Sequence, residues 1–210
     1  MLFRRHDAPR DDDEWKRFLR EHRFGQLVAG GTGGRIPFVV PAHYSFDGDA
    51  TIRLHLARDN PAWEALEESP MAVMAVVDAY AFIPSYWSEP EPYGVGTSYY
   101  AAVQAIGECR SVDDPEELAD LIRVQLGDMQ PEGGQEPALD ASDPGYQRML
   151  RRIRGIEMTI TDVRAKFKFG GNKPEERRLE IARRLSERSE GLDPLARRAL
   201  LERLPEHDET

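Results

Sequence analysis

Alternation of apolar and polar residues with a period of two, between glycine-rich turns, constrains the fold of this chain most strongly. The clearest example is the segment 50–57, in which Ile52, Leu54 and Leu56 alternate with polar or charged neighbours. Such alternation is typical of a strand that buries one face. The run Asp47-Gly48-Asp49 directly precedes this segment and has the residue types of a tight hairpin turn. The pattern therefore predicts antiparallel strands joined by short turns.

Further strands and helices are predicted along the chain, with loops over 84–96 and 127–144. Strands are expected on both sides of the glycine-rich run 30–34, over 26–29 and 36–46. Three later segments rich in apolar, β-branched or aromatic residues predict further strands, over 71–77, 97–109 and 156–169. Apolar residues at helical spacing or good capping residues predict helices that begin near residues 11, 61, 113, 146 and 174. Antiparallel hairpins followed by strands that alternate with helices predict an α+β barrel.

The length of 210 residues suits one domain with a well-buried core, because ordinary domains contain roughly 100–200 residues. We expect a single domain over residues 1–190. Residues 191–210 are expected to form a C-terminal tail that is partly disordered or helical.

The charge of the chain argues against a general nucleic-acid or membrane binder. It carries 28 basic and 38 acidic side chains, for a net charge of −10, which repels phosphate-rich surfaces. Residues 148–188 are an exception, with 13 basic and 6 acidic side chains. This segment either forms solvated helix faces that other segments neutralise, or contains an anion site. No apolar stretch approaches the roughly 18 residues of a membrane span, and the single cysteine suits a reducing compartment. We therefore expect a cytoplasmic protein.

Motifs for familiar catalytic chemistry are absent from the sequence. The five histidines have no metal-ligand spacing, so no metal site is expected. Cys109 is expected to be structural, because no helix N-terminus lies beside it to lower the pKa of its thiol. The dense aromatic residues between 80 and 100 indicate either core or dimer packing, or stacking against a flat ligand.

Three segments carry a family resemblance: 55–63 (HLARDNPAW), 97–107 (TSYYAAVQAIG) and 166–176 (KFKFGGNKPEE). In this order and spacing they resemble the PaiB-type FMN-binding negative transcriptional regulator family, which belongs to the split-barrel flavoproteins that include pyridoxamine phosphate oxidase. The resemblance implies an FMN-binding split β-barrel, antiparallel and Greek-key-like, with peripheral helices. It also implies a homodimer with FMN at the subunit interface. The chain departs from the family at Ser98-Tyr99, where the family has Trp-Asn, and at Gln104, where it has His.

The first segment also suggests a phosphate site on physical grounds. Arg58 ends a predicted strand and Asn60 begins the next helix, so a guanidinium and backbone N–H groups converge on one point. The alternative is an ordinary helix cap with Arg58 in solvent. From the family pattern, Thr97 and Tyr100 would border the flavin ring or its ribityl chain.

The last segment concentrates positive charge around a turn. Lys166, Lys168 and Lys173 are three of the four lysines of the chain and surround Gly170-Gly171-Asn172. The family pattern places Lys168, Asn172 and Lys173 near the cofactor. The alternative is a solvated basic turn.

Two classes of function remain open at this point. The favoured one is an FMN-binding, oxidoreductase-like flavoprotein, in which the cofactor performs the redox chemistry. Its substrate and electron donor are not identified, because no general acid or base can be named. The alternative is a transcriptional regulator that binds DNA or a partner through residues 148–188, or a flavin-free sensor of a small ligand on the same fold.

Overall fold

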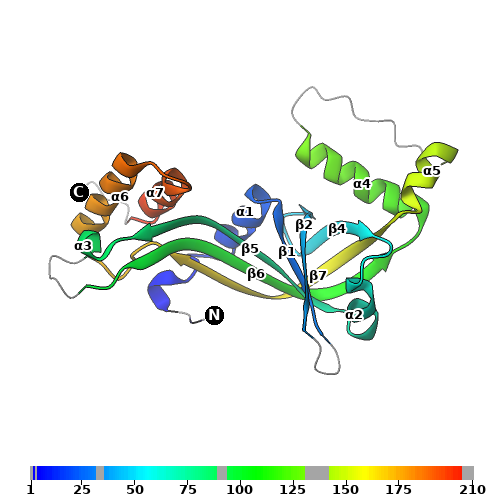
Figure 1. Ribbon diagram of the computed structural model, residues 1–210, viewed down its shortest axis with the longest axis horizontal. Coiled ribbons are helices and arrows are strands. Elements are labelled where there is room, and N and C mark those ends of the chain that lie inside the picture. Colours follow the sequence, from blue (N-terminus) through cyan, green and yellow to red (C-terminus); the bar gives the residue numbers. More distant parts are fainter. Residues whose placement is uncertain (1, 3, 32–35, 89–93, 131–141, 205–210) are drawn as a thin grey trace. The chain divides into compact units, whose positions relative to one another are not determined.

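The computed structural model describes residues 2, 4–31, 36–88, 94–130 and 142–204. Seven strands form one sheet, and helices precede, separate and follow the strands along the chain (Figure 1). The strands are β1 (Phe24–Ala29), β2 (Phe38–His43), β3 (Ser45–Phe46), β4 (Thr51–Ala57), β5 (Met71–Ile83), β6 (Thr97–Val112) and β7 (Ile153–Lys168). The helices are the 3-10 helix η1 (Arg5–Asp7), α1 (Asp12–Glu21), α2 (Ala62–Glu68), α3 (Ser85–Ser88), α4 (Pro115–Met129), α5 (Pro144–Leu150), α6 (Glu175–Arg188) and α7 (Asp193–Glu202).

The strand order in the sheet is β2-β1-β5-β6-β7-β4-β3. Strand β1 pairs antiparallel with β2 and β5, and β4 pairs antiparallel with β3 and β7. Within the described residues the two end strands do not pair with each other, so the sheet is open, as in a split barrel. The α+β class and antiparallel sheet predicted from the sequence are confirmed. No helix in the described part of the chain is long and apolar enough to cross a membrane.

The chain forms two compact units. The central unit comprises residues 15–76 and 104–164, and the terminal unit comprises residues 1–14, 77–103 and 165–210. Strands β5, β6 and β7 contribute residues to both units. The single domain predicted over residues 1–190 stays a prediction.

The central unit is built on the hairpin that the sequence predicted. Asp47 Oδ1 accepts hydrogen bonds from the backbone N–H groups of Asp49, Ala50 and Thr51 at 2.8–3.0 Å, and Gly48 has a φ of 91°. The turn leads into β4, where Ile52 and Leu54 are fully buried. A second cluster packs helix α4 against α5 and the neighbouring strand ends, through Val112, Leu118, Leu121 and Leu150.

The terminal unit contains a helical hairpin in which α6 packs against α7 (Figure 1). Leu185 of α6 and Leu200 of α7 are fully buried. The buried guanidinium of Arg178 donates hydrogen bonds to the carbonyls of Leu200 and Arg203 at 3.3 and 2.9 Å, and so holds the last turn of α7. Helix α7 lies within the segment that the sequence analysis expected to be a disordered or helical tail.

Two strand predictions are corrected by the structure. The segment 36–46 forms two strands, because the chain changes partner at Tyr44, from β1 to β4. The hydroxyl of the buried Tyr44 donates a hydrogen bond to the carbonyl of Leu19 at 3.0 Å, which anchors this side chain to α1. The strand expected over 71–77 continues to Ile83. Its alternation changes phase at Ala79, whose φ of 52° places an irregularity in the middle of the strand.

Three expected boundaries also shift. The expected loop 84–96 includes helix α3, and the expected loop 127–144 begins only after α4 ends at Met129. Helix α5 ends at Leu150, and β7 begins at Ile153, three residues earlier than expected. Parts of the glycine-rich turn 30–34 and of both predicted loops lie outside the described residues.

Candidate functional site: a basic pocket in the terminal unit

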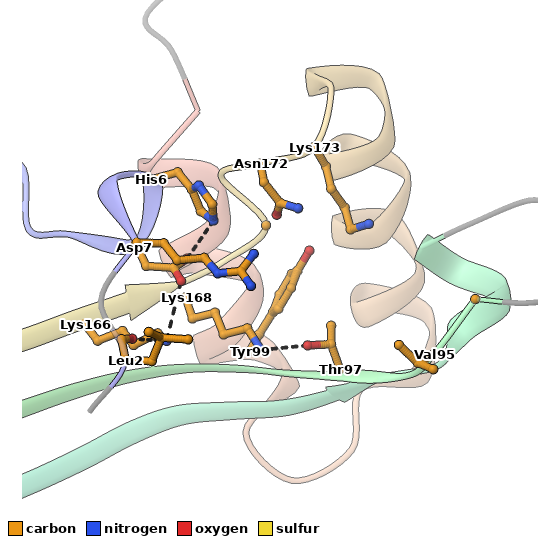
Figure 2. Close-up of a pocket in the computed structure, with 13 residues that line it drawn as sticks. Leu2, His6, Asp7, Val95, Thr97, Tyr99, Lys166, Lys168, Asn172 and Lys173 are labelled. Atoms are coloured by element: carbon orange, nitrogen blue, oxygen red, sulfur yellow. Dashed lines mark hydrogen bonds and ion pairs between the residues drawn. The ribbon is translucent and has the colours of Figure 1, made fainter.

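The terminal unit contains an open pocket of about 700 Å³. Its walls come from the N-terminal segment, the start of β6, the end of β7 and the turn that follows β7 (Figure 2). Pockets of roughly 300–1,000 Å³ are typical of small-molecule and cofactor sites. The cavity is therefore large enough for a mononucleotide-sized ligand.

Positive charge dominates the lining of this pocket. Arg4, Lys166, Lys168 and Lys173 line it, against the single carboxylate of Asp7. Lys166 is buried, and its ammonium lies 3.6 Å from the Asp7 carboxylate and donates a hydrogen bond to the carbonyl of Leu2 at 2.8 Å. Asp7 therefore balances Lys166, and the remaining lining keeps a surplus of positive charge in a chain whose net charge is negative.

Lys168 is held by a specific contact at the pocket wall. Its ammonium donates a hydrogen bond to Thr97 Oγ1 at 2.7 Å (Figure 2). Burial lowers the pKa of Lys168, and the neighbouring charges of Lys166 and Arg4 lower it further, while Asp7 opposes them. A bound anion would raise this pKa again, because it favours the charged form of the amine. The site is thus electrostatically suited to bind an anion.

The turn after β7 brings two polar side chains to the same pocket. The backbone N–H of Lys173 donates to the carbonyl of Gly170 at 2.9 Å, and Gly170 has a φ of 72°. This left-handed conformation favours glycine. The turn places the side chains of Asn172 and Lys173 at the pocket (Figure 2).

Tyr99 projects into the pocket from β6. It is 1% exposed, and its ring packs edge-on against Phe169, with the ring centroids 6.0 Å apart. Its hydroxyl is buried and has no hydrogen-bond partner among the described residues. Burial raises the pKa of this hydroxyl to about 12, so it is protonated at neutral pH.

The structure brings together four of the seven residues predicted for the site. Thr97, Lys168, Asn172 and Lys173 line the pocket. Tyr100 is in the same unit but is not part of the lining, and its ring centroid lies 6.0 Å from the Lys166 ammonium. The part that these residues play in cofactor binding stays a prediction.

Arg58 and Asn60 belong to the central unit. Asn60 Oδ1 accepts a hydrogen bond from the backbone N–H of Ala62 at 2.9 Å, at the start of α2. The Arg58 guanidinium donates to Asp113 Oδ1 at 3.0 Å and to two backbone carbonyls at 3.1 Å. Burial acts to raise the pKa of Asp113, but the hydrogen bonds and charges of Arg154 and Arg58 outweigh it and lower this pKa. The phosphate-binding role predicted for Arg58 and Asn60 stays a prediction.

The N-terminal contribution and Tyr99 were not predicted from the sequence. Arg4, His6 and Asp7 lie more than 150 residues before the lysine-rich segment 166–173 that they meet at the pocket, and no local pattern signals this. His6 Nε2 lies 3.8 Å from the Asp7 carboxylate. Tyr99 could have been suspected, because it lies on the same face of the predicted strand as Val103, which is fully buried. No group of three or more metal-ligating side chains occurs among the described residues.

A family comparison identifies the class of protein. The family model described as "Putative FMN-binding domain" matches residues 1–162. This match covers well over half of the 210 residues, so the chain belongs to that family. It confirms, at the level of the family, the FMN cofactor expected from the sequence. The comparison with curated proteins gave no match.

Solved structures share the fold at low sequence identity. The flavocytochrome Anf3 from Azotobacter vinelandii is 16% identical, with a TM-score of 0.61 over 83% of this chain and 77% of that chain. The FAD and heme binding protein from Mycobacterium smegmatis is 13% identical, with a TM-score of 0.60 over 81% and 78%. The conserved hypothetical protein Rv2991 from Mycobacterium tuberculosis is 17% identical, with a TM-score of 0.57 over 83% and 95%. These likenesses concern the fold alone.

Proposed function

We propose that this protein is an FMN-binding redox flavoprotein whose basic pocket in the terminal unit binds the phosphate-bearing end of the cofactor. The observation that carries the proposal is the convergence of Thr97, Lys168, Asn172 and Lys173 on one cationic cavity in a chain of an FMN-binding family. A phosphate is doubly charged near neutral pH and is bound best by ammonium groups and N–H donors. The donors of this pocket fit that group.

Each residue has a distinct part in the proposed site. Lys168 and Lys173 would hold the phosphate, and Thr97 fixes the ammonium of Lys168 through the hydrogen bond at 2.7 Å. Asn172 would donate through its side-chain amide. Bound FMN supplies hydride or electron transfer, and the protein supplies binding and orientation. Two solved structures of the same fold are a flavocytochrome and an FAD- and heme-binding protein, which supports a redox role.

Titration with FMN tests this proposal. The wild-type protein should quench FMN fluorescence, and its flavin absorbance should bleach when a reduced nicotinamide or a chemical reductant is added. Lys168→Gln should weaken FMN binding about tenfold, because it removes a charged donor from a partly desolvated site. Lys16→Gln is the matched control, since Lys16 is the fourth lysine and pairs with Asp49 at 2.7 Å in the central unit. Equal affinities for the two variants would place the phosphate elsewhere, and a wild type that binds no FMN would end the proposal.

The protein is also proposed to be a homodimer. Val77, Tyr80 and Phe82 lie on one face of β5 in the terminal unit and are 66%, 51% and 49% exposed. A row of large apolar side chains in water is costly, and a second copy would cover it. Light scattering at micromolar concentration should give about twice 23.9 kDa, whereas a monomeric mass would contradict this assembly.

A regulator of the PaiB type is the alternative, and the charge arrangement disfavours it. Several arginines of residues 148–188 are engaged in ion pairs: Arg154 with Asp113 and Glu67, Arg184 with Glu180, and Arg188 with Asp193. Guanidinium groups that are already paired contribute less to phosphate contacts on a duplex. We therefore infer that the basic segment serves the fold and the pocket, and that specific duplex binding at physiological salt is not expected.

A further inference from the structure

Tyr99 occupies a position at which this chain departs from the family pattern, so the pattern does not indicate what the side chain does. The family's Thr-Trp-Asn-Tyr run is Thr97-Ser98-Tyr99-Tyr100 in this chain. Tyr99 is therefore larger than the residue that the pattern expects, and it carries a hydroxyl in place of an amide. Its role has to be read from its surroundings.

The surroundings of Tyr99 leave its hydroxyl group unsatisfied. The hydroxyl is buried, faces the Gly170–Lys173 turn, and has no hydrogen-bond partner among the described residues (Figure 2). A buried polar group without a partner is destabilising, so buried hydroxyls are nearly always hydrogen-bonded in native proteins. The pocket side of Tyr99 is where a partner can enter, because Tyr99 lines the cavity.

The chemistry around this hydroxyl favours an acceptor that carries negative charge. Lys173 lines the same part of the pocket, and Arg178 is close enough to influence the pKa of Tyr99. Ammonium and guanidinium groups are donors only, and neither can accept the phenolic proton. Since the high pKa keeps Tyr99 protonated, the hydroxyl and both cations all favour an anionic acceptor.

The backbone opposite Tyr99 is adapted to this side chain. Gly170 lies so close to the Tyr99 hydroxyl that a Cβ at residue 170 would overlap the hydroxyl oxygen. Only glycine therefore leaves room for a tyrosine at residue 99 in this arrangement. The pair brings a phenolic donor against the same turn that presents Asn172 and Lys173.

We propose that Tyr99 is a ligand-binding residue particular to this chain, whose hydroxyl donates a hydrogen bond to the phosphate of FMN at the Gly170–Lys173 turn. This inference rests on the proposed function and adds to it a residue that determines affinity for the phosphate. Tyr99 thereby distinguishes FMN from riboflavin, which lacks the phosphate.

The test compares both flavins with Tyr99→Phe. Removing the hydroxyl should weaken FMN binding about 10- to 100-fold, because hydrogen bonds to a charged group are the strong ones. Riboflavin binding should stay within about twofold of the wild type. The melting temperature of the ligand-free variant should be unchanged or higher, because the substitution removes an unsatisfied buried hydroxyl.

Tyr146→Phe is the matched control. The Tyr146 hydroxyl is also buried without a partner among the described residues, but it lies in the central unit, away from the pocket lining. This variant should behave like Tyr99→Phe in the ligand-free melt and like the wild type in the FMN titration. The combination separates a ligand contact from a purely structural effect.

Three other results of these titrations would each contradict a specific claim. Wild-type affinity of Tyr99→Phe for FMN would overturn the inference and leave the proposed function standing. Equal losses for FMN and riboflavin would show that the hydroxyl contacts the ring or ribityl chain, which overturns the phosphate assignment. A wild type that binds neither flavin would overturn the proposed function and, with it, this inference.

Discussion

Replacing Glu14 with alanine is expected to lower the free energy of unfolding by about 3–5 kcal/mol, because it leaves a largely buried guanidinium without its counter-ion. Glu14 is 5% exposed and lies 2.6 Å from Arg203 Nη1 through Oε2. Arg203 also donates to the carbonyl of Ala8 at 2.7 Å and lies 5.3 Å from the ring centroid of Phe167. This one ion pair therefore joins the N-terminal segment, β7 and the end of α7.

Urea unfolding followed by circular dichroism measures this effect. Arg198→Ala is the control, because Arg198 lies on α7, the helix that Arg203 follows, and its 3.8 Å contact with Glu202 is exposed. Its free energy of unfolding should change by less than about 0.5 kcal/mol. The double variant Glu14→Leu/Arg203→Met should be more stable than Glu14→Ala, since removing both partners leaves no buried charge unpaired. A loss below about 1 kcal/mol for Glu14→Ala would show that Arg203 finds water or another partner.

Local patterns predicted those parts of the fold that local chemistry determines. The hairpin at Asp47-Gly48-Asp49 and strand β4 follow from turn residues and alternation, and both are present. Helix α4 begins where Asp114 caps it, with the side chain accepting from the backbone N–H groups of Glu116 and Glu117. Such signals lie within a few residues of one another, so they can be read without knowledge of the tertiary structure.

The errors in strand extent arise from tertiary contacts. The sequence of segment 36–46 has the pattern of one uninterrupted strand. Tyr44, however, is buried beside α1, and at this residue the chain changes its pairing partner from β1 to β4. Strand β5 continues past Val77 through Ala79, which has a positive φ that alanine rarely adopts. Neither event has a sequence signal, since both depend on what packs against the segment.

The residues of the candidate site also differ in whether local sequence patterns reveal them. Lys168, Asn172 and Lys173 could be predicted because they lie within six residues, at the end of β7 and on the turn that follows it. Asp7 could not, because it meets Lys166 only through the fold. The unsatisfied hydroxyl of Tyr99 is likewise a property of three-dimensional burial. The lysines of the pocket were therefore predictable from the sequence, whereas Arg4, Asp7 and the contacts that position the lysines were not.

Gly170→Ala is expected to destabilise the protein by about 2–4 kcal/mol and to weaken FMN binding about as much as Tyr99→Phe does, about 10- to 100-fold. The φ of 72° at Gly170 costs a residue with a side chain about 1 kcal/mol or more. The new Cβ would also overlap the Tyr99 hydroxyl, and overpacking of this kind typically costs about 1–3 kcal/mol. Relief of the overlap requires Tyr99 to move, which withdraws its hydroxyl from the proposed phosphate position.

Two further variants separate the backbone cost from the steric cost. Gly191 has a φ of 51° and no atom within 4 Å of the place where a Cβ would lie, so Gly191→Ala should show the backbone cost alone, about 1 kcal/mol. In the double variant Tyr99→Phe/Gly170→Ala, the hydroxyl oxygen that causes the overlap is gone, and part of the stability lost in Gly170→Ala should return. A double-mutant cycle from denaturant unfolding then gives the coupling between residues 99 and 170. Strictly additive effects, or equal losses for Gly170→Ala and Gly191→Ala, would show that the turn does not press against Tyr99 and would remove the structural basis for a phosphate contact there.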